Sequence, residues 1–242
     1  LTVTFHAPKV GHLLADGGAS CCGKLRVVDI GLPRQYWLDL PIKVLETLPE
    51  SHHQTVRKVE RSVGMLPKQV WASHKFSHGH ALILSGPSGR GGAARLSARG
   101  ALRVGAGVVT LGCPPEAIPE NAARLDAVML RPLADAAVLA ETLEDQRINA
   151  LCLGPALGTG AREAGLVQTA LASGRDLVLD ADALTILSQR ADLFAALHDG
   201  CVLTPHAGEF ARLFPDIAEK LAAPAIKGPA YSKVDATREA AK

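Results

Sequence analysis

From residue 82 onward, four apolar runs each break into glycine, proline or acidic residues and then resume with helical spacing. This pattern is typical of a buried parallel strand that leads through a ligand-facing loop into a crossover helix. Ligands of parallel sheets bind outside the carboxyl ends of the strands, so four such loops predict one cleft. The segments are residues 82–94 (LILSGPSGRGGAA), 151–158 (LCLGPALG), 177–182 (LVLDAD) and 202–209 (VLTPHAGE).

The same part of the chain predicts an α/β fold. Six apolar runs alternate with alanine- and leucine-rich segments of helical spacing, which favours βαβ units, a parallel sheet and right-handed crossovers. We expect helices on both faces of this sheet. The strands are expected at residues 81–84, 107–111, 128–130, 150–153, 177–179 and 201–203.

Composition divides the chain into three regions. Residues 1–33 hold two strand-like runs, at residues 1–5 and 25–31, with a glycine-rich loop between them. Residues 34–78 are polar, rich in histidine and lysine and almost aperiodic, which is typical of a linker. Residues 79–242 carry the alternating pattern. We therefore expect a small N-terminal remnant, a linker and an α/β domain.

Charge and hydropathy exclude several classes of function. The 242 residues are 48% hydrophobic and 21% charged, which is enough to bury at least one sizeable core. A net charge of +2 from scattered basic residues does not favour nucleic acid or an anionic membrane as a partner. The charge-free stretches carry Gly and Pro and fall short of the roughly 20 apolar residues of a membrane span. We expect a cytoplasmic homo-oligomer that acts on a small molecule.

Cysteine and histidine do not indicate a metal site. The five cysteines form no CxxC pair, and three of them lie in apolar runs, so we interpret them as buried thiols in a reducing compartment. The nine histidines include two clusters, at residues 52–53 and 74–80, but neither has a second ligand cluster at a zinc-binding spacing. Solvated loop residues are the expected interpretation.

The first glycine loop does not fit the two common nucleotide-binding fingerprints. Gly86, Gly89 and Gly91 reverse the G-x-G-x-x-G spacing, and no acidic residue ends the next predicted strand. No Gly-Lys-Ser/Thr sequence follows, which excludes a Walker loop. A helix starting near Gly92 would direct backbone N–H groups at the cleft, which suits an anionic or dinucleotide ligand. The alternative is that these glycines only close a tight turn.

The segment after the last predicted strand is the most specific of the four. Pro205 disfavours helix at Thr204, so His206 stands where the strand has just ended. Glu209 falls in the first turn of the next helix, where a carboxylate caps the helix or complements its dipole. His206 is either a residue of the cleft or a surface residue at a helix cap.

Two aspartates follow the third predicted strand. Asp180 and Asp182 either position Mg²⁺ or a ligand hydroxyl, or cap a helix that opens at Ala183. The residues themselves leave these alternatives open.

The string from His74 to Phe214 resembles the ADP/ATP-dependent NAD(P)H-hydrate dehydratase family, whose domain has the ribokinase-like fold. Residues 1–33 resemble the closing strands of the NAD(P)H-hydrate epimerase domain, which precedes the dehydratase in bifunctional repair enzymes. The dehydratase resemblance is carried by residues 91–96, 101–110, 153–158, 179–184 and 203–210, and the epimerase resemblance by residues 2–5, 9–13 and 28–33.

The resemblance implies a reaction and a set of contacts. The family phosphorylates the ring hydroxyl of hydrated NADH or NADPH with ADP or ATP and Mg²⁺, and then eliminates phosphate to restore the cofactor. Ala93 and the loop from Gly154 to Gly158 would contact the hydrate, and His206 to Glu209 would lie along it. The alternatives are another ribokinase-like kinase acting on a small alcohol, and a non-catalytic nucleotide-binding protein.

The chain also departs from the family pattern. Ala156 replaces a glycine of the Gly-Pro-Gly-Leu-Gly loop, where its methyl group either tightens the loop or excludes a positive φ. The family's Lys-Gly nucleotide loop and Gly-Thr/Ser-Gly-Asp catalytic motif do not occur before Lys242, and the potassium ligands of the epimerase are missing. We therefore expect a fragment with unknown catalytic residues, a sheet incomplete at the C-terminus and no activity of its own.

Overall fold

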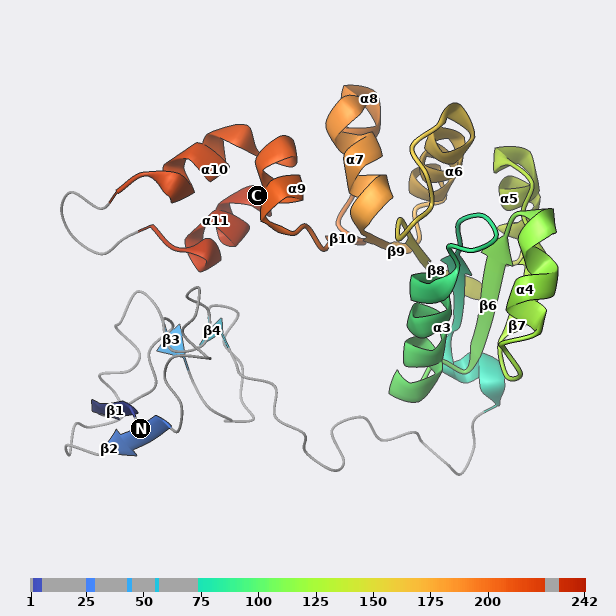
Figure 1. The fold of residues 1–242 in the computed structure, drawn as a ribbon, viewed down its shortest axis with the longest axis horizontal. Helices are drawn as coiled ribbons and strands as arrows, with labels where there is room; N and C mark the ends of the chain where they lie inside the picture. The colour runs from blue at the N-terminus through green and yellow to red at the C-terminus, as the bar shows by residue number, and fades with distance from the viewer. Residues whose placement is uncertain (1, 6–24, 29–42, 45–54, 57–73, 225–230) are drawn as a thin grey trace. The chain divides into compact units, whose positions relative to one another are not determined.

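The computed structural model describes residues 2–5, 25–28, 43–44, 55–56, 74–224 and 231–242. The chain forms two compact units, Leu1–Met65 and Leu66–Lys242. In the first unit, β1 (Thr2–Phe5) pairs in parallel with β2 (Leu25–Val28), and β3 (Lys43–Val44) pairs in parallel with β4 (Thr55–Val56) (Figure 1). Both strand-like runs of residues 1–33 therefore contain strands. The predicted linker contains β3 and β4 among its described residues, and the three proposed regions remain a prediction.

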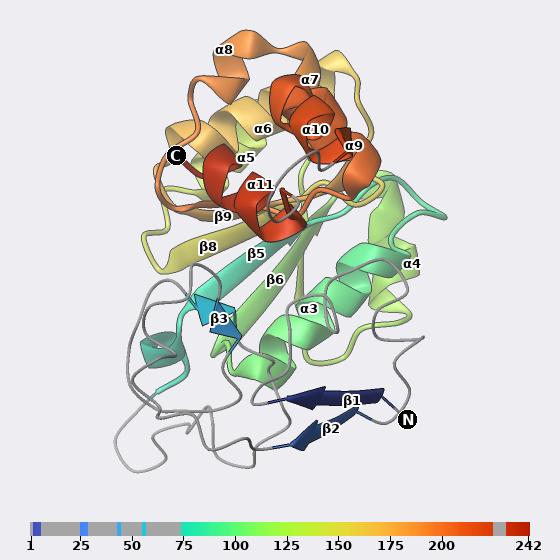
Figure 2. The ribbon, with the colours of Figure 1, turned by 90° about the vertical axis from the view of Figure 1, so that its left-hand side faces the viewer.

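The second unit contains a six-stranded parallel sheet in the order β10-β9-β8-β5-β6-β7 (Figures 1 and 2). Each predicted strand is confirmed, and both of its ends lie within two residues of the predicted ends. The α/β fold class is confirmed as well. The strands are β5 (His80–Leu84), β6 (Val108–Cys113), β7 (Met129–Pro132), β8 (Ile148–Leu153), β9 (Asp176–Leu179) and β10 (Cys201–Leu203).

Helices follow the strands along the chain. The helix expected near Gly92 begins there and ends before Gly105, whose φ of 131° suits a residue without a side chain. None of the helices in the described residues is long and apolar enough to cross a membrane. The helical segments are η2 (Lys75–His78), α3 (Gly92–Val104), η3 (Pro115–Ala117), α4 (Ile118–Ala122), α5 (Ala136–Thr142), α6 (Ala161–Ala172), α7 (Ala181–Gln189), α8 (Ala191–Phe194), α9 (Ala207–Leu213), α10 (Pro215–Ala222) and α11 (Lys233–Ala240).

The core has two layers because neighbouring residues of a strand point to opposite faces of the sheet. Leu82 of β5 belongs to the layer that α5, α6 and α7 cover. Ile83 belongs to the layer under α3, where Ala94 and Ala98 allow a close approach of the helix. Figure 2 shows α3 and α4 on one side of the sheet and α5 to α7 on the other. Helices therefore cover both faces around β5 and β6.

The α3 face of the sheet is less covered at β9 and β10. Val178 and Val202 are paired across these strands and are 37% and 56% exposed. Leu177 and Leu179, which alternate with Val178, are buried in the other layer. Among the described residues, the helices on the α3 face of the sheet thus leave β10 partly uncovered.

Three of the five cysteines lie in described strands as free thiols. Cys113 is buried, and Cys152 and Cys201 are half-buried. Burial raises the pKa of each thiol, which keeps the groups neutral. The prediction of a buried thiol is confirmed for Cys113, whereas Cys152 and Cys201 are only partly buried.

Candidate functional site

The loops after β5 and β8 are in direct backbone contact. A Cβ atom built on Gly86 would lie 1.7 Å from the carbonyl oxygen of Ala156, so no side chain fits at this position. Gly86 is buried in the loop that leads to α3. Gly86 therefore allows a close approach between two loops that lie seventy positions apart in the sequence.

Ala156 has a φ of 54°, in the left-handed region that favours glycine. Of the two alternatives for its methyl group, exclusion of a positive φ is therefore wrong. The loop keeps the backbone conformation that a glycine would take and carries a strain on the order of 1 kcal/mol. Contact with Gly86 through the Ala156 carbonyl holds this conformation in place.

The loop after β8 also contacts the loop after β9. A Cβ atom on Gly154 would lie 1.7 Å from the carbonyl oxygen of Asp180, and the φ of Gly154 is 134°. The amide of Asp182 donates to the carbonyl of Gly154 at 3.3 Å, and the Gly158 amide donates to the Asp182 carboxylate at 2.8 Å. Gly154 is thus required by both space and backbone conformation.

The two aspartates have different local roles. The helix that was expected to open at Ala183 begins two residues earlier, at Ala181, and that expectation is wrong. Asp180 precedes the helix but makes no side-chain cap. Instead, the Thr204 hydroxyl donates to the Asp180 carboxylate at 3.0 Å, which joins the loops after β9 and β10. Asp182 lies inside the first turn and holds the Gly158 loop.

His206 is the N-cap of α9. Its Nδ1 accepts hydrogen bonds from the amides of Gly208 at 3.0 Å and Glu209 at 3.4 Å. An accepting Nδ1 carries no proton, so the neutral ring holds its proton on Nε2, which lies 3.3 Å from Glu209 Oε1. The side chain of His206 is 69% exposed. The ring therefore both caps the helix and faces solvent at the carboxyl edge of the sheet.

Glu209 completes this cap from the interior. Its Oε2 accepts the backbone amide of His206 at 2.9 Å, and its side chain is only 8% exposed. The expected capping position in the first helical turn is confirmed. Because both carboxylate oxygens face His206, the geometry favours a positioning role for Glu209.

A carboxylate from α4 holds the first glycine loop. Glu120 accepts hydrogen bonds from the Gly89 amide at 2.5 Å, from the Ser88 hydroxyl at 2.9 Å and from Arg95 at 3.0 Å. The Gly89 bond, followed by those from Ser88 and Arg95, lowers the pKa of Glu120 to about 2. Sequence patterns did not single out Glu120. Its only local signal is an acidic residue in the first turn of a short helix.

Ala93 occupies the second position of α3 and is exposed, whereas Gly154 is buried and Gly158 half-buried. In the described part of the chain, no hydrogen bond joins Ala93 or His206 to the Gly154 loop. The four loops do line one edge in the strand order β5, β8, β9 and β10. A cavity of about 570 Å³ at this edge is lined by residues that follow β5, β6, β7 and β8, and by no residue of the loops after β9 and β10. Of the five expected contact residues only Gly158 lines it, together with Pro87, Arg90, Pro115, Thr159 and Arg162.

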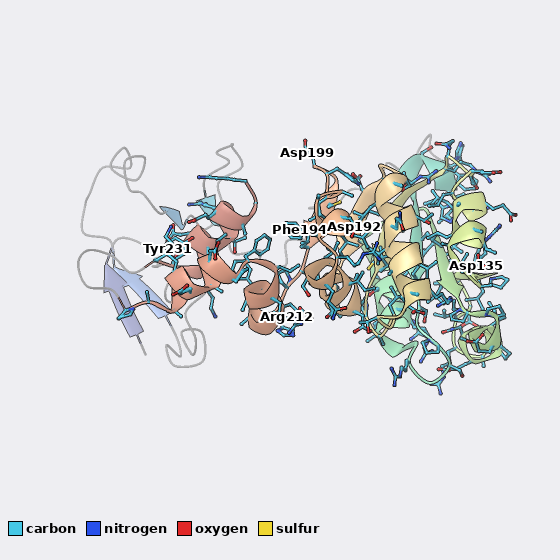
Figure 3. All side chains as sticks on the ribbon, turned by 90° about the horizontal axis from the view of Figure 1, so that it is seen from above. Asp135, Asp192, Phe194, Asp199, Arg212 and Tyr231 are labelled. Carbon is cyan, nitrogen blue, oxygen red and sulfur yellow. The ribbon has the colours of Figure 1, made fainter. Side chains whose placement is uncertain are left out.

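Helix starts at this edge differ in how they are capped. The first turns of α3, α6 and α7 receive no side-chain cap, although in α7 the Asp182 amide donates to the Gly154 carbonyl at 3.3 Å. In contrast, Asp135, which is labelled in Figure 3, caps α5 by accepting the amide of Val138, and His206 caps α9. The described residues contain no group of three side chains that could hold a metal ion. This edge is therefore suited to anionic groups that bind backbone amides.

A parallel sheet with these crossovers and this row of glycine loops defines a ribokinase-like α/β protein. A ribokinase-like protein of Enterococcus faecalis has the same fold, with a TM-score of 0.55 and 24% identity over 64% of this chain and 54% of its own. The NAD(P)H-hydrate dehydratase family model matches residues 81–239, and the chain belongs to this family.

Individual relatives agree with the family assignment. The chain is 34% identical over 215 residues to a bifunctional NAD(P)H-hydrate repair enzyme of Coxiella burnetii, covering 88% of this chain and 40% of the relative. A Gloeobacter violaceus enzyme of the same name is 38% identical over 197 residues, covering 75% and 39%. The chain thus spans about two fifths of the length of these curated relatives. The Bacillus subtilis ADP/ATP-dependent NAD(P)H-hydrate dehydratase, crystallised with ATP/Mg²⁺, matches with a TM-score of 0.52 and 28% identity over 64% of this chain and 54% of its own.

Proposed function

We propose that this chain forms the hydrate-binding part of an ADP- or ATP-dependent NAD(P)H-hydrate dehydratase. The observation that carries the proposal is the row of family loops at one sheet edge, where three helices begin without a side-chain cap. A dinucleotide hydrate carries a pyrophosphate, and backbone amides at helix starts bind such anions. The family membership supplies the identity of the substrate class.

The proposed reaction has two steps. The ring hydroxyl of the hydrate takes a phosphoryl group from the nucleotide, so one P–O bond forms as the bond to the leaving nucleotide breaks. The phosphate then leaves with the electron pair of the ring C–O bond, and the neighbouring ring carbon loses a proton, which restores the double bond. Phosphoryl transfer depends mainly on positioning and charge stabilisation. Backbone loops held in one conformation suit that task.

The residues of the edge have separate proposed roles. Gly86 and Gly154 leave room for the loops to approach each other and the hydrate, and the first turn of α3 around Ala93 binds an anionic group of the substrate. The exposed imidazole of His206 contacts the substrate, while Glu209, whose Oε1 lies 3.3 Å from Nε2, holds the ring in place. Asp182 fixes Gly158 against the start of α7.

Mg²⁺ fits this edge only in part. It is commonly held by one or two carboxylates together with substrate phosphates. Asp180 is a carboxylate at the carboxyl edge, and its Oδ2 has no partner among the described residues. We propose that Asp180 would hold the Mg²⁺ of the nucleotide, which would supply charge neutralisation for phosphoryl transfer.

For the whole protein we also propose an epimerase activity that uses K⁺, a cytoplasmic location and a homo-oligomeric state. The support for the epimerase is that the curated relatives are named as bifunctional repair enzymes.

Binding of NADH hydrate to the chain tests the proposal, measured by ligand-observed NMR. We expect saturable binding that His206→Ala weakens about tenfold, the equivalent of one hydrogen bond to a charged or strongly polar group. His74→Ala is the matched control, because His74 also caps a helix by accepting an amide at Nδ1, from Phe76 at 3.1 Å. It lies at the amino end of β5 and should leave binding unchanged.

Activity is measured on the protein encoded by the complete reading frame that contains this chain. Recovery of the reduced-nicotinamide absorbance band should require ADP or ATP with Mg²⁺. Absence of hydrate binding, or phosphorylation of an unrelated small alcohol in place of the hydrate, would overturn the proposed function.

A further inference from the structure

A second cavity, of about 620 Å³, opens at the opposite edge of the sheet. His80, Met129 and Ile148 line it, and they are the first residues of β5, β7 and β8. The cavity therefore runs from the amino ends of β5 and β8 along β7, whose last residue, Pro132, also lines it, and its lining includes no residue of the four glycine loops. Its size is within the range of cavities that hold small molecules.

The floor of this cavity is polar and buried. His80 and Thr110 are 6% and 5% exposed, and the Nε2 atom of His80 lies 2.8 Å from the Thr110 hydroxyl. The other ring nitrogen, Nδ1, has no hydrogen-bond partner among the described residues. Burial lowers the pKa of His80, so the ring is neutral. An unsatisfied buried polar atom is costly.

The mouth of the cavity is cationic and aromatic. The Lys75 ammonium lies 5.2 Å and the Arg147 guanidinium 4.5 Å from the centre of the Phe76 ring. Asp145 binds Arg147 through Nε and Nη2, at 2.8 and 2.7 Å. No described carboxylate pairs with Lys75. Arg131 also lines the cavity, but it pairs with Glu141 at 3.7 Å, so Lys75 is the cation of the described lining without a described carboxylate partner.

The walls between floor and mouth are largely apolar. Met129, Leu130, Val138 and Ile148 contribute aliphatic surface, and Met129 is 49% exposed although it is a large hydrophobic residue. A ligand with an apolar body would bury this surface, while its charged end would stay near Lys75.

We propose that this cavity is a second binding site, for a small monocarboxylate with a flat or compact apolar body. The carboxylate binds Lys75 at the mouth, the body packs on Met129 and Phe76, and the inner end approaches His80. The Asp145 carboxylate disfavours a polyphosphate, because it places a negative charge beside the cations that would have to bind it. The proposal does not depend on the proposed dehydratase function.

Benzoate is the probe, and its binding to the chain is measured by NMR titration against the uncharged analogue benzamide. We expect saturable benzoate binding and benzamide binding that is at least about fivefold weaker, the size of one solvent-exposed ion pair. Lys75→Met should weaken benzoate binding about fivefold for the same reason. Met129→Trp, which fills the cavity from its wall, should weaken both ligands.

Arg103→Met is the matched control, because Arg103 is an exposed cation in the last turn of α3, outside the cavity lining. It should leave benzoate binding unchanged. Lack of saturable benzoate binding, equal binding of benzamide, or an unchanged affinity in Lys75→Met would overturn the proposal. Tighter binding of adenosine monophosphate with the same dependence on Lys75 would overturn the ligand class in favour of a nucleotide.

Discussion

The carboxylate of Asp182 accepts the backbone amide of Gly158 at 2.8 Å, and this bond joins the loops that follow β8 and β9. The two residues belong to different predicted segments of the sequence. Their contact depends on β8 and β9 being neighbours in the sheet, which places the ends of both strands at one edge. The bond therefore reports directly on the geometry of the candidate site.

Replacing Asp182 with alanine should destabilise the protein by about 1–2 kcal/mol, because the partly buried amide of Gly158 loses its charged acceptor. Asp182→Asn keeps an acceptor oxygen and should lose less. Urea unfolding of the three proteins measures the difference. If both variants unfold with the same free energy as the wild type, the bond contributes nothing to stability.

Gly154→Ala should destabilise the protein by on the order of 4 kcal/mol or more, because the new methyl group would overlap the Asp180 carbonyl. Gly174→Ala is a matched control. Gly174 also has a positive φ, of 64°, but a Cβ atom at this position would meet nothing within 4 Å. This control should cost only about 1 kcal/mol, from backbone conformation alone. If the two variants have similar unfolding free energies, the loops after β8 and β9 move apart at little cost to accommodate the new methyl group.

Ala156→Gly should stabilise the protein by at most about 0.5 kcal/mol, because the entropy cost of glycine offsets roughly half or more of the relieved strain. Glycine adopts the φ of 54° without the strain that a Cβ atom creates, although it also raises the entropy of the unfolded chain. Thermal unfolding by calorimetry measures the gain. The opposite sign would mean that the packing of the Ala156 methyl group outweighs the relief of strain.

Glu120 should make stability depend on acid pH. Its pKa in the folded protein is about 2, below the ordinary value of 4.5, so its contribution is fully present above pH 4.5. The contribution is lost as the pH falls from about 4.5 towards 2, because in this range the carboxylate takes up a proton in the unfolded chain but stays ionised in the folded protein. The stability difference between the wild type and Glu120→Gln should therefore be constant near neutral pH and shrink in acid.

Thermal melts at a series of pH values test this dependence. Glu116→Gln is a suitable control, because Glu116 is an exposed acidic residue in the neighbouring turn and its side chain makes no hydrogen bond or ion pair among the described residues. A difference between wild type and Glu120→Gln that stays constant down to pH 2 would contradict the role assigned to Glu120.

The sequence by itself determined which residues form the six strands and where the glycine loops follow them. Buried parallel strands are continuous apolar runs, and β6 is buried at every position, so hydropathy alone identifies it. The turn at residues 204–209 could also be predicted, because Pro205 restricts the backbone of the preceding residue and Glu209 caps the helix that follows. Such local patterns depend on a few neighbouring residues, so they can be interpreted without knowledge of the fold.

Only the tertiary structure decided the order of the strands and the contacts between their loops. The approach of Gly86 to Ala156 and the bonds from Glu120 to the first glycine loop join residues that lie far apart in the sequence. The positive φ of Ala156 also depends on this packing, which holds a conformation that alanine alone disfavours. The buried His80 at the amino end of β5 acquires its cavity in the same way, since its walls come from β7, α5 and β8. These features arise from the packing of distant segments, and no local pattern of residues encodes them.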